Sequence, residues 1–187
     1  MRIRFAVAAD AAAVAEIYAH YVRQTAITFA AETPLAEDYA ARMADARYPF
    51  LVAEEAGGVA GFIYAAAFRQ KAAYRWDVEL TIYLAPGQES RGIGSRLMAA
   101  CLRLLTAQGY LNAYSCITLP NPASVGLHRR FGFEELGVFP RTGYKLGQWH
   151  DVVWMARRLG EFADSPAEPV RIAELEAPER FLGAEDA

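Results

Sequence analysis

The chain has 187 residues, of which 54% are hydrophobic and 22% are charged, and its formal net charge is −3. This length suits one domain with at most a short appendage, and the apolar fraction excludes a wholly disordered chain. No apolar run approaches the roughly 18 residues of a membrane helix, and the start lacks a secretory leader, so we expect a cytoplasmic protein without a membrane partner. The lack of a basic balance argues against nucleic acid as a partner.

Charge is divided unevenly between the body of the chain and its end. Residues 161–187 hold eight acidic and two basic side chains, which leaves 14 acidic and 17 basic residues before them. Hydrophobic periodicity also fades after Arg158, where several prolines appear. We therefore expect one domain over residues 1–160 and an acidic C-terminal extension over 161–187 that is a loosely ordered end rather than a separate domain. An arm that grips a second subunit is the alternative.

The first third of the chain predicts a strand, two helices and a hairpin. Alternating apolar residues predict the strand over residues 2–7, and Asp10 is expected to cap the helix that follows. After a loop, Pro34 opens a second helix, which runs to about Arg47. Two strands, over residues 50–55 and 59–67, are joined by Gly57-Gly58, a hairpin signal.

The rest of the chain alternates strands and helices before it ends in a hairpin. The periodicity predicts strands over 76–84, 112–119, 134–145 and 149–158, and helices over 91–109 and from Asn121-Pro122 to about Gly132. This order of elements is neither a strict alternation of strands and helices nor that of an all-β protein. It predicts an α/β fold with a mixed, mainly antiparallel central sheet flanked by helices.

A glycine-rich loop, Gln88–Gly94, joins a predicted strand to a predicted helix. Gly92 and Gly94 let a ligand approach the backbone, and the free N–H groups of the helix start favour an anion such as pyrophosphate. Gly-x-Gly alone is a weak signal, and an ordinary strand–helix turn that needs glycine for steric reasons is the alternative that the pattern by itself favours. A Walker loop is excluded because the chain has no Gly-Lys pair, and a Rossmann fingerprint because Leu97 occupies the place of its third glycine.

The strand over residues 76–84 has a polar face in its middle. Alternation places Val78, Leu80, Ile82 and Leu84 on one face and Asp77, Glu79, Thr81 and Tyr83 on the other. A carboxylate that is partly desolvated in a pocket has a raised pKa and can remove a proton from an ammonium group. Glu79 is therefore a candidate general base, and a solvated strand face is the alternative.

Several motifs together resemble the GCN5-related N-acetyltransferase (GNAT) superfamily over about Ile3 to Arg158. They are the strand Val78-Glu79-Leu80-Thr81-Ile82-Tyr83-Leu84, the loop Arg91-Gly92-Ile93-Gly94, and the later Asn121-x-x-Ser124-x-x-Leu127-His128 and Gly132-Phe133. The segments Ala73-Tyr74-Arg75-Trp76-Asp77-Val78-Glu79 and Gly143-Tyr144-Lys145-Leu146-Gly147-Gln148-Trp149-His150-Asp151 are similar to the phosphinothricin and methionine sulfoximine N-acetyltransferase branch.

The resemblance implies the GNAT acyl-CoA N-acyltransferase fold and transfer of an acetyl group from acetyl-CoA, without a metal, to the α-amine of a small amino-acid-like substrate. It implies Glu79 as the base, and His128 as the acid for the departing thiolate or as a substrate contact. The residues that it implies for acetyl-CoA binding are Tyr83, Leu84, Arg91, Gly92, Ile93, Gly94, Ser95, Asn121 and Ser124. The residues that it implies for binding the amino substrate are Phe29, Arg69, Lys71, Tyr74 and Tyr83. A homodimer is implied as well.

Two positions depart from the pattern of the family. Glu89 stands where the superfamily has Gln or Arg, which predicts weaker CoA binding, and Lys71 stands where the branch often has Arg. A protein or peptide N-acetyltransferase and a non-catalytic acyl-CoA-binding module are the alternative functions. Cys101 and Cys116 are expected to be buried thiols, and His150 is expected to be structural.

Overall fold

Seven strands form one sheet, in the order β1-β2-β3-β4-β5-β7-β6, in a computed structural model that describes residues 1–183. Neighbouring strands are antiparallel except for β4 and β5, which are parallel. The predicted class, with a mainly antiparallel sheet, is confirmed. The strands are Arg2–Phe5 (β1), Phe50–Glu55 (β2), Gly58–Ala67 (β3), Asp77–Leu84 (β4), Asn112–Thr118 (β5), Glu134–Lys145 (β6) and Gln148–Arg158 (β7).

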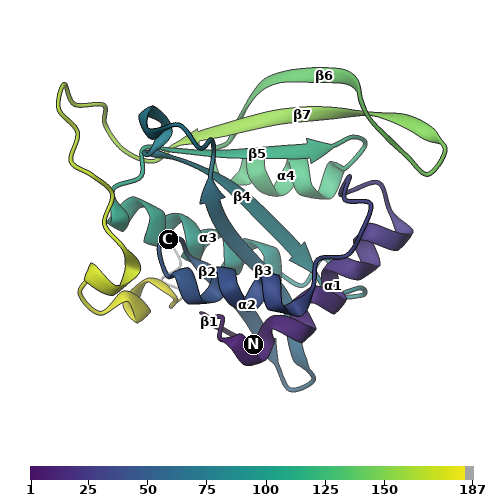
Figure 1. Cartoon of the computed structure of the whole chain (residues 1–187), viewed down its shortest axis with the longest axis horizontal. Coiled ribbons are helices and arrows are strands. Elements are labelled where there is room, and N and C mark those ends of the chain that lie inside the picture. Colours follow the sequence, from purple (N-terminus) through teal and green to yellow (C-terminus); the bar gives the residue numbers. More distant parts are fainter. Residues whose placement is uncertain (184–187) are drawn as a thin grey trace.

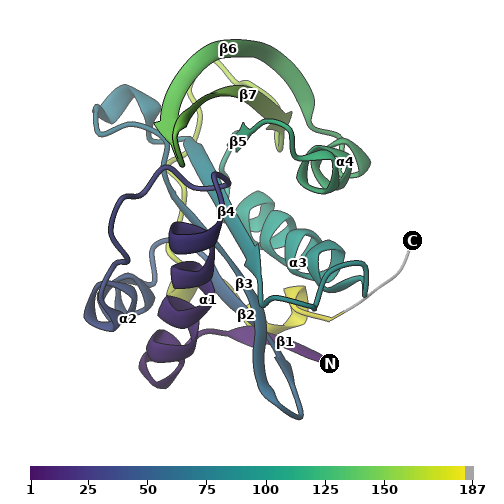
Figure 2. The ribbon, with the colours of Figure 1, turned by 90° about the vertical axis from the view of Figure 1, so that its right-hand side faces the viewer.

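Helices cover both faces of the sheet (Figures 1 and 2). Helices α1 (Ala11–Gln24) and α2 (Ala36–Asp45) lie on one face, and α3 (Ile93–Gln108) lies on the other. The short α4 (Pro122–Arg130) follows β5 on the α3 side. Each face has its own apolar core, because α3 buries one whole stripe of side chains against β2, β3 and β4 while α1 and α2 enclose a second, aromatic cluster. None of the helices in residues 1–183 is long and apolar enough to span a membrane.

The starts of two helices and the cap of a third differ from those predicted. The carboxylate of Asp10 accepts hydrogen bonds from the Arg4 guanidinium at 2.7 and 2.8 Å and from the Val7 N–H at 2.9 Å, so it closes the turn before α1 instead of capping the helix. Helix α2 begins two residues after Pro34, where Asp38 accepts the N–H of Leu35 at 2.9 Å. Helix α3 begins at Ile93, because Gly92 is in the left-handed region with φ 78°.

The parallel strands β4 and β5 separate after a short stretch of pairing. Their register joins Asp77–Glu79 to Asn112–Tyr114 only, although β4 continues to Leu84 and β5 to Thr118. Figure 1 shows the two ribbons diverging from this common origin. The sheet is therefore split between its two halves, and one edge of β4 loses its strand partner beyond Glu79.

The C-terminal extension packs on the domain, which corrects the expectation of a loosely ordered end for the described residues 161–183. Ile172 is buried, and Leu175, Phe181 and Leu182 pack against the α3-side core. The Gln108 side chain at the end of α3 donates to the carbonyl of Val170 at 2.8 Å. In Figure 1 the extension runs from the end of β7 down the side of the molecule to α3. Residues 184–187 of the predicted extension lie outside the described part.

Candidate active site

The glycine loop presents backbone N–H groups at the start of α3. The first intrahelical bond runs from the Arg96 N–H to the Gly92 carbonyl at 3.1 Å. The N–H groups of Ile93, Gly94 and Ser95 therefore have no carbonyl one helical turn before them and can bind an anion. The Ile93 side chain is only 1% exposed, so this residue can offer a ligand its backbone alone.

Glycine is needed at the two positions of this loop for different structural reasons. A Cβ at Gly92 would meet open space, but the positive φ of this residue favours glycine. A Cβ at Gly94 would lie 3.3 Å from the Leu127 side chain, so Gly94 allows α3 to approach α4 closely. The steric explanation of the motif thus holds together with the anion-binding one.

Strand β4 offers further backbone groups where it leaves β5. Its register with β3 is regular: the Ala85 N–H donates to the Ala60 carbonyl of β3 at 2.9 Å, and the Asp77 carbonyl accepts the N–H of Phe68, just after β3, at 3.3 Å. Since backbone groups alternate in direction along a strand, those of Ile82 and Leu84 point to the opposite edge. The Leu84 carbonyl there accepts the Tyr21 hydroxyl at 2.7 Å. The N–H groups on this edge face the split between β4 and β5.

Glu79 lies at the origin of this split, opposite Tyr114 in the parallel register. Its side chain is half-buried, and desolvation raises the pKa of its carboxyl group, partly offset by the positive charge of Arg69. A solvated strand face, which was the alternative for this residue, does not fit this environment. A half-buried carboxylate with a raised pKa is suited to accepting a proton.

An aromatic group surrounds the positive charge next to Glu79. The rings of Phe68 and Tyr114 stack with centroids 4.2 Å apart, and Trp154 meets Phe68 edge-on at 5.9 Å. The Arg69 guanidinium lies over Phe68 at 4.2 Å. The ring of Tyr74, 40% exposed, lies 6.1 Å from that of Phe68. Three predicted substrate residues, Arg69, Lys71 and Tyr74, thus share the loop between β3 and β4 that ends beside Glu79.

Cys116 is exposed, which corrects the prediction that both cysteines are buried; Cys101 is buried as expected. The side chain of Cys116 lies on the face of β5 opposite Ala113 and Ile117, which are buried in the α3-side core. Neighbouring atoms leave the thiol accessible but, together with the negative charge of Glu79, raise its pKa to about 11. The group is therefore a protonated thiol at neutral pH and a poor nucleophile.

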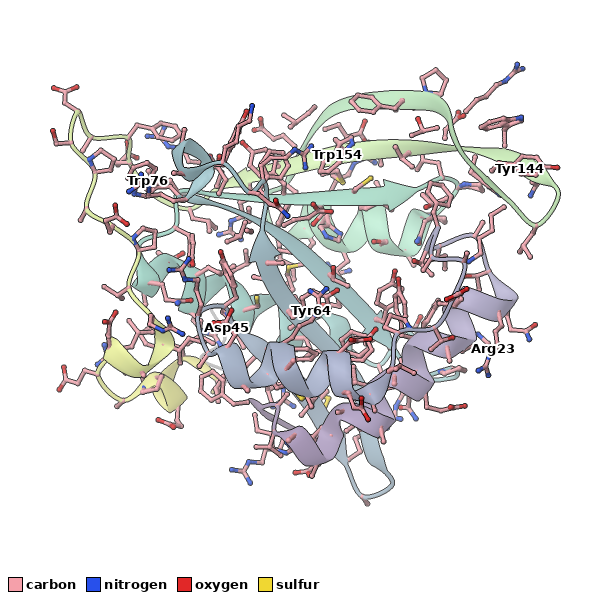
Figure 3. All side chains as sticks on the ribbon, viewed as in Figure 1. Arg23, Asp45, Tyr64, Trp76, Tyr144 and Trp154 are labelled. Carbon is pink, nitrogen blue, oxygen red and sulfur yellow. The ribbon has the colours of Figure 1, made fainter. Side chains whose placement is uncertain are left out.

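Phe29 lies apart from the other predicted substrate residues. Its ring packs on Gly143 in the β6–β7 hairpin, where a Cβ would come within 2.2 Å of it, and lies 6.2 Å from the ring of the buried His150. In Figure 3, Tyr144, the neighbour of Gly143, and Trp76 lie at opposite ends of the sheet. Phe29 therefore borders the hairpin side of the site, away from the loop that carries Tyr74.

His128 is buried inside α4, with 2% of its surface exposed. Its Nδ1 lies 2.8 Å from the carbonyl of Ser124, which can only accept, so Nδ1 carries the proton in this arrangement. Burial lowers the pKa of the imidazole, which is neutral at pH 7, with the lone pair on Nε2. Nε2 is buried and has no hydrogen-bond partner among the described residues. An exposed helix histidine, the alternative for His128, is excluded.

The other residues predicted to bind the cofactor have structural partners. The Asn121 side chain caps α4 by accepting the Ser124 N–H at 3.1 Å. Arg91 is held by Gln88 and by Glu55, whose carboxylate lies 3.1 Å away, and the Ser95 hydroxyl accepts Arg130 at 3.3 Å. Tyr83 packs among the rings of Tyr18, Tyr21 and Phe62, so its side chain belongs largely to the aromatic core.

The arrangement fits acetyl-CoA. The N–H groups at the start of α3 suit the pyrophosphate, and the unpaired edge of β4 offers N–H groups to the pantetheine and thioester carbonyl. When bound, acetyl-CoA supplies an activated acetyl group. The residues that would hold it are Leu84 and the loop from Gly92 to Ser95.

Sequence reasoning missed Tyr114 and Cys116 as neighbours of Glu79. The alternation of β5 places both on one face, but the sequence does not show that this face adjoins Glu79. Only the parallel pairing of Glu79 with Tyr114 reveals that this face continues the polar face of β4.

The chain is similar to known acetyltransferases along most of its length. A family model described as "Acetyltransferase (GNAT) domain" matches residues 3–154. A phosphinothricin N-acetyltransferase of Streptomyces viridochromogenes is 38% identical, covering 91% of this chain and 93% of that protein. An L-methionine sulfoximine/L-methionine sulfone acetyltransferase of Salmonella typhimurium is 34% identical, covering 87% and 97%.

Solved structures agree. A GNAT superfamily phosphinothricin acetyltransferase from Sinorhizobium meliloti in complex with acetyl-CoA superposes with a TM-score of 0.82 at 35% identity, covering 97% of this chain and 98% of that one. A Salmonella typhimurium structure with its cofactor acetyl-CoA gives 0.85 at 33% identity, covering 89% and 98%. The expected fold, co-substrate and N-acetyltransferase activity are confirmed. The chain belongs to the GNAT family of acetyltransferases.

Proposed function

We propose that this enzyme transfers the acetyl group of acetyl-CoA directly to the α-amine of a small amino-acid-like substrate of the phosphinothricin, methionine sulfoximine or methionine sulfone type. The observation that carries the proposal is the half-buried carboxylate of Glu79 at the point where β4 and β5 separate, beside the loop of Arg69. The names of the related proteins support the same class of substrate.

Glu79 is the general base in this proposal. An amine reaches the site as an ammonium ion and must lose a proton before its nitrogen can attack a thioester carbon. Glu79, directly or through water, takes that proton, and its raised pKa brings it closer to that of the donor. The Leu84 N–H donates to the thioester oxygen as charge develops on it. The protonated thiol of Cys116 takes no part as a nucleophile.

His128 supplies a proton acceptor rather than a ready acid. With the proton on Nδ1 held by Ser124, the neutral ring has only a lone pair at Nε2. His128 can protonate a departing thiolate only after Nε2 has first received a proton. We propose that it relays a proton released as the amide forms to the CoA sulfur, and that water is the other route for this proton.

Arg69 and Lys71 hold the anionic group of the substrate beside Tyr74, and Phe29 borders the site from the side of the β6–β7 hairpin. The guanidinium of Arg69 lies on Phe68 and is close enough to Glu79 to lower the pKa of its carboxyl group. A carboxylate or phosphinate bound by Arg69 would place the amine of an α-amino acid near this base. The side chains of Arg91, Asn121 and Ser124 contact acetyl-CoA in addition to the backbone N–H groups of the glycine loop.

We further propose a homodimer formed through the β6–β7 hairpin. Six large apolar side chains on this hairpin are between 48% and 62% exposed, and β6 is an edge strand: Leu136, Val138, Phe139, Tyr144, Leu146 and Trp149. A patch of this kind marks a protein interface. We also propose a cytoplasmic location, because Cys101 and Cys116 are free thiols, as in a reducing compartment.

The test is thiol release from acetyl-CoA with a panel of amines: phosphinothricin, methionine sulfoximine, methionine sulfone, ordinary amino acids and a lysine peptide. We expect saturable release with the phosphinothricin and methionine analogues. Release with the peptide alone would replace the proposal by a peptide N-acetyltransferase. CoA binding without release from any amine would replace it by a non-catalytic module.

A further inference from the structure

The loop between β3 and β4, residues 68–76, is exposed although it carries the proposed substrate residues. Every side chain from Arg69 to Arg75 is exposed. A turn within the loop is closed by the Tyr74 N–H to the Lys71 carbonyl at 3.0 Å and by the Arg75 N–H to the Ala72 carbonyl at 3.2 Å. These local bonds shape the turn, and the stacking of Phe68 on Tyr114 holds the start of the loop, but neither fixes its exposed far end at Arg75. A surface loop of this kind needs an outside contact to hold one position.

The C-terminal extension supplies that contact at the end of the loop. The indole N–H of Trp76 donates to the carbonyl of Ala167 at 2.8 Å, and the guanidinium of Arg75 pairs with the carboxylate of Glu168. Arg75 also lies over the Trp76 ring, 5.1 Å from its centroid. In Figure 3, Trp76 lies beside the extension. Two consecutive loop residues are thus bound by two consecutive residues of the extension.

The extension is itself fixed to the body of the domain just beyond these contacts. The Val170 N–H donates to the Gln108 carbonyl at 2.8 Å, and the Gln108 side chain returns a bond of 2.8 Å to the Val170 carbonyl. Arg171 donates to the Asp45 carbonyl at 2.6 Å, and the buried Ile172 follows. The position of Glu168 is therefore set by α3 and α2.

We propose that the C-terminal extension is a positioning element for substrate binding, which holds the 68–76 loop through Ala167 and Glu168 and so sets where Arg69, Lys71 and Tyr74 meet the amino-acid substrate. The inference rests on the proposed function for its kinetic consequence. Its structural part, an extension that restrains the loop, stands without it. Acetyl-CoA contacts the opposite end of β4 and is not affected.

The test combines Glu168→Arg with the charge-swapped pair Arg75→Glu/Glu168→Arg. Glu168 is exposed, so its replacement leaves the core intact. The control is Glu161→Gln, which removes another exposed ion pair of the extension, with Arg158, away from the loop. We expect Glu168→Arg to raise the KM of the amino substrate about threefold to fivefold, the size that an exposed ion pair supplies, with the KM of acetyl-CoA unchanged. The KM of the swapped pair for the amino substrate should be closer to the wild-type value than that of Glu168→Arg, and the KM of the control should equal the wild-type value.

Limited digestion with trypsin reports on the loop independently of activity, because Arg69 and Lys71 lie within it. We expect trypsin to cleave Glu168→Arg at these two residues faster than it cleaves the wild type, while the melting temperature stays unchanged. The swapped pair should be cleaved more slowly than Glu168→Arg. Unchanged cleavage and unchanged KM in Glu168→Arg would overturn the inference. Faster cleavage in a protein that acetylates none of the amines tested would instead contradict the proposed function and leave the restraint of the loop in place.

Discussion

At the scale of single residues, the site depends on a carboxyl group that the fold keeps partly out of water. Desolvation is the main cause of the raised pKa of Glu79, and Arg69 counteracts it only in part. A raised pKa in the folded state means that folding favours the protonated form. Above that pKa the ionised Glu79 therefore lowers the stability of the protein, a cost tolerated at functional sites.

Glu79→Gln should separate activity from stability. The amide keeps the shape of the side chain but cannot accept the proton, so we expect kcat to fall by about 10²- to 10⁴-fold at neutral pH. The melting temperature at pH 8 should not fall, because the destabilising charge is gone. The acid limb of the wild-type pH–rate profile, above the ordinary range of a glutamate, should be absent from the variant. An unchanged rate at every pH would refute the role of Glu79 as base.

His128→Phe tests the buried imidazole. Phenylalanine keeps the ring contact with Phe133, 5.0 Å away in the native protein, but has no Nε2. Because the pKa of His128 is lowered in the folded state, its contribution to stability is complete above the ordinary histidine pKa and is lost as the pH falls below it. Between pH 7 and pH 5 the melting temperature of the wild type should therefore fall more than that of the variant. We also expect the kcat of the variant to be at least tenfold lower than that of the wild type. Equal kcat values would leave proton relay to water.

At the scale of elements, the glycine loop binds through its backbone but carries an unfavourable charge. Glu89 lies near Tyr21, whose raised pKa is caused by burial and, second, by the Glu89 charge, and the Tyr21 hydroxyl contacts the Leu84 carbonyl. A carboxylate at this place repels the phosphates of CoA through solvent, an effect that salt screens.

Glu89→Gln should tighten CoA binding. We expect the Kd measured by titration calorimetry to fall about threefold at low salt, with the difference shrinking as salt is added. Glu37→Gln, an exposed acidic residue in the first turn of α2, serves as the control and should leave the Kd unchanged. A weaker Kd in Glu89→Gln would show that the carboxylate contributes a favourable contact.

The order of elements and the place of Glu79 on the polar face of β4 could be predicted from the sequence, because strand alternation and helix periodicity are local signals. Three features could not. His128 is flanked by Arg129 and Arg130, so its burial depends on the packing of α4. Cys116 is exposed because its side chain lies on the face of β5 opposite the α3-side core, and the sequence does not show which face a helix covers. Ile172 and Leu175 show no period of their own, and their packing requires the surface of α3.

At the scale of the whole molecule, the apolar hairpin β6–β7 predicts the assembly. Leu136→Glu combined with Val138→Glu places two charges on the edge strand, whose side chains are 62% and 48% exposed. We expect light scattering to give a dimer for the wild type and a monomer for this variant. Leu35→Glu, at an equally exposed apolar residue beside α2, should remain a dimer. A monomeric wild type would contradict the proposed interface.

At the scale of the whole molecule, the central claim is the proposed direct transfer of the acetyl group between two substrates bound at once, and initial rates measured while both acetyl-CoA and the amino substrate are varied test it most directly. Direct transfer requires both to be bound at once, so the double-reciprocal plots should intersect, and Cys116→Ala should show the same pattern. Parallel lines, lost in Cys116→Ala, would mean that an acetyl-cysteine forms first and would contradict the role assigned to Glu79.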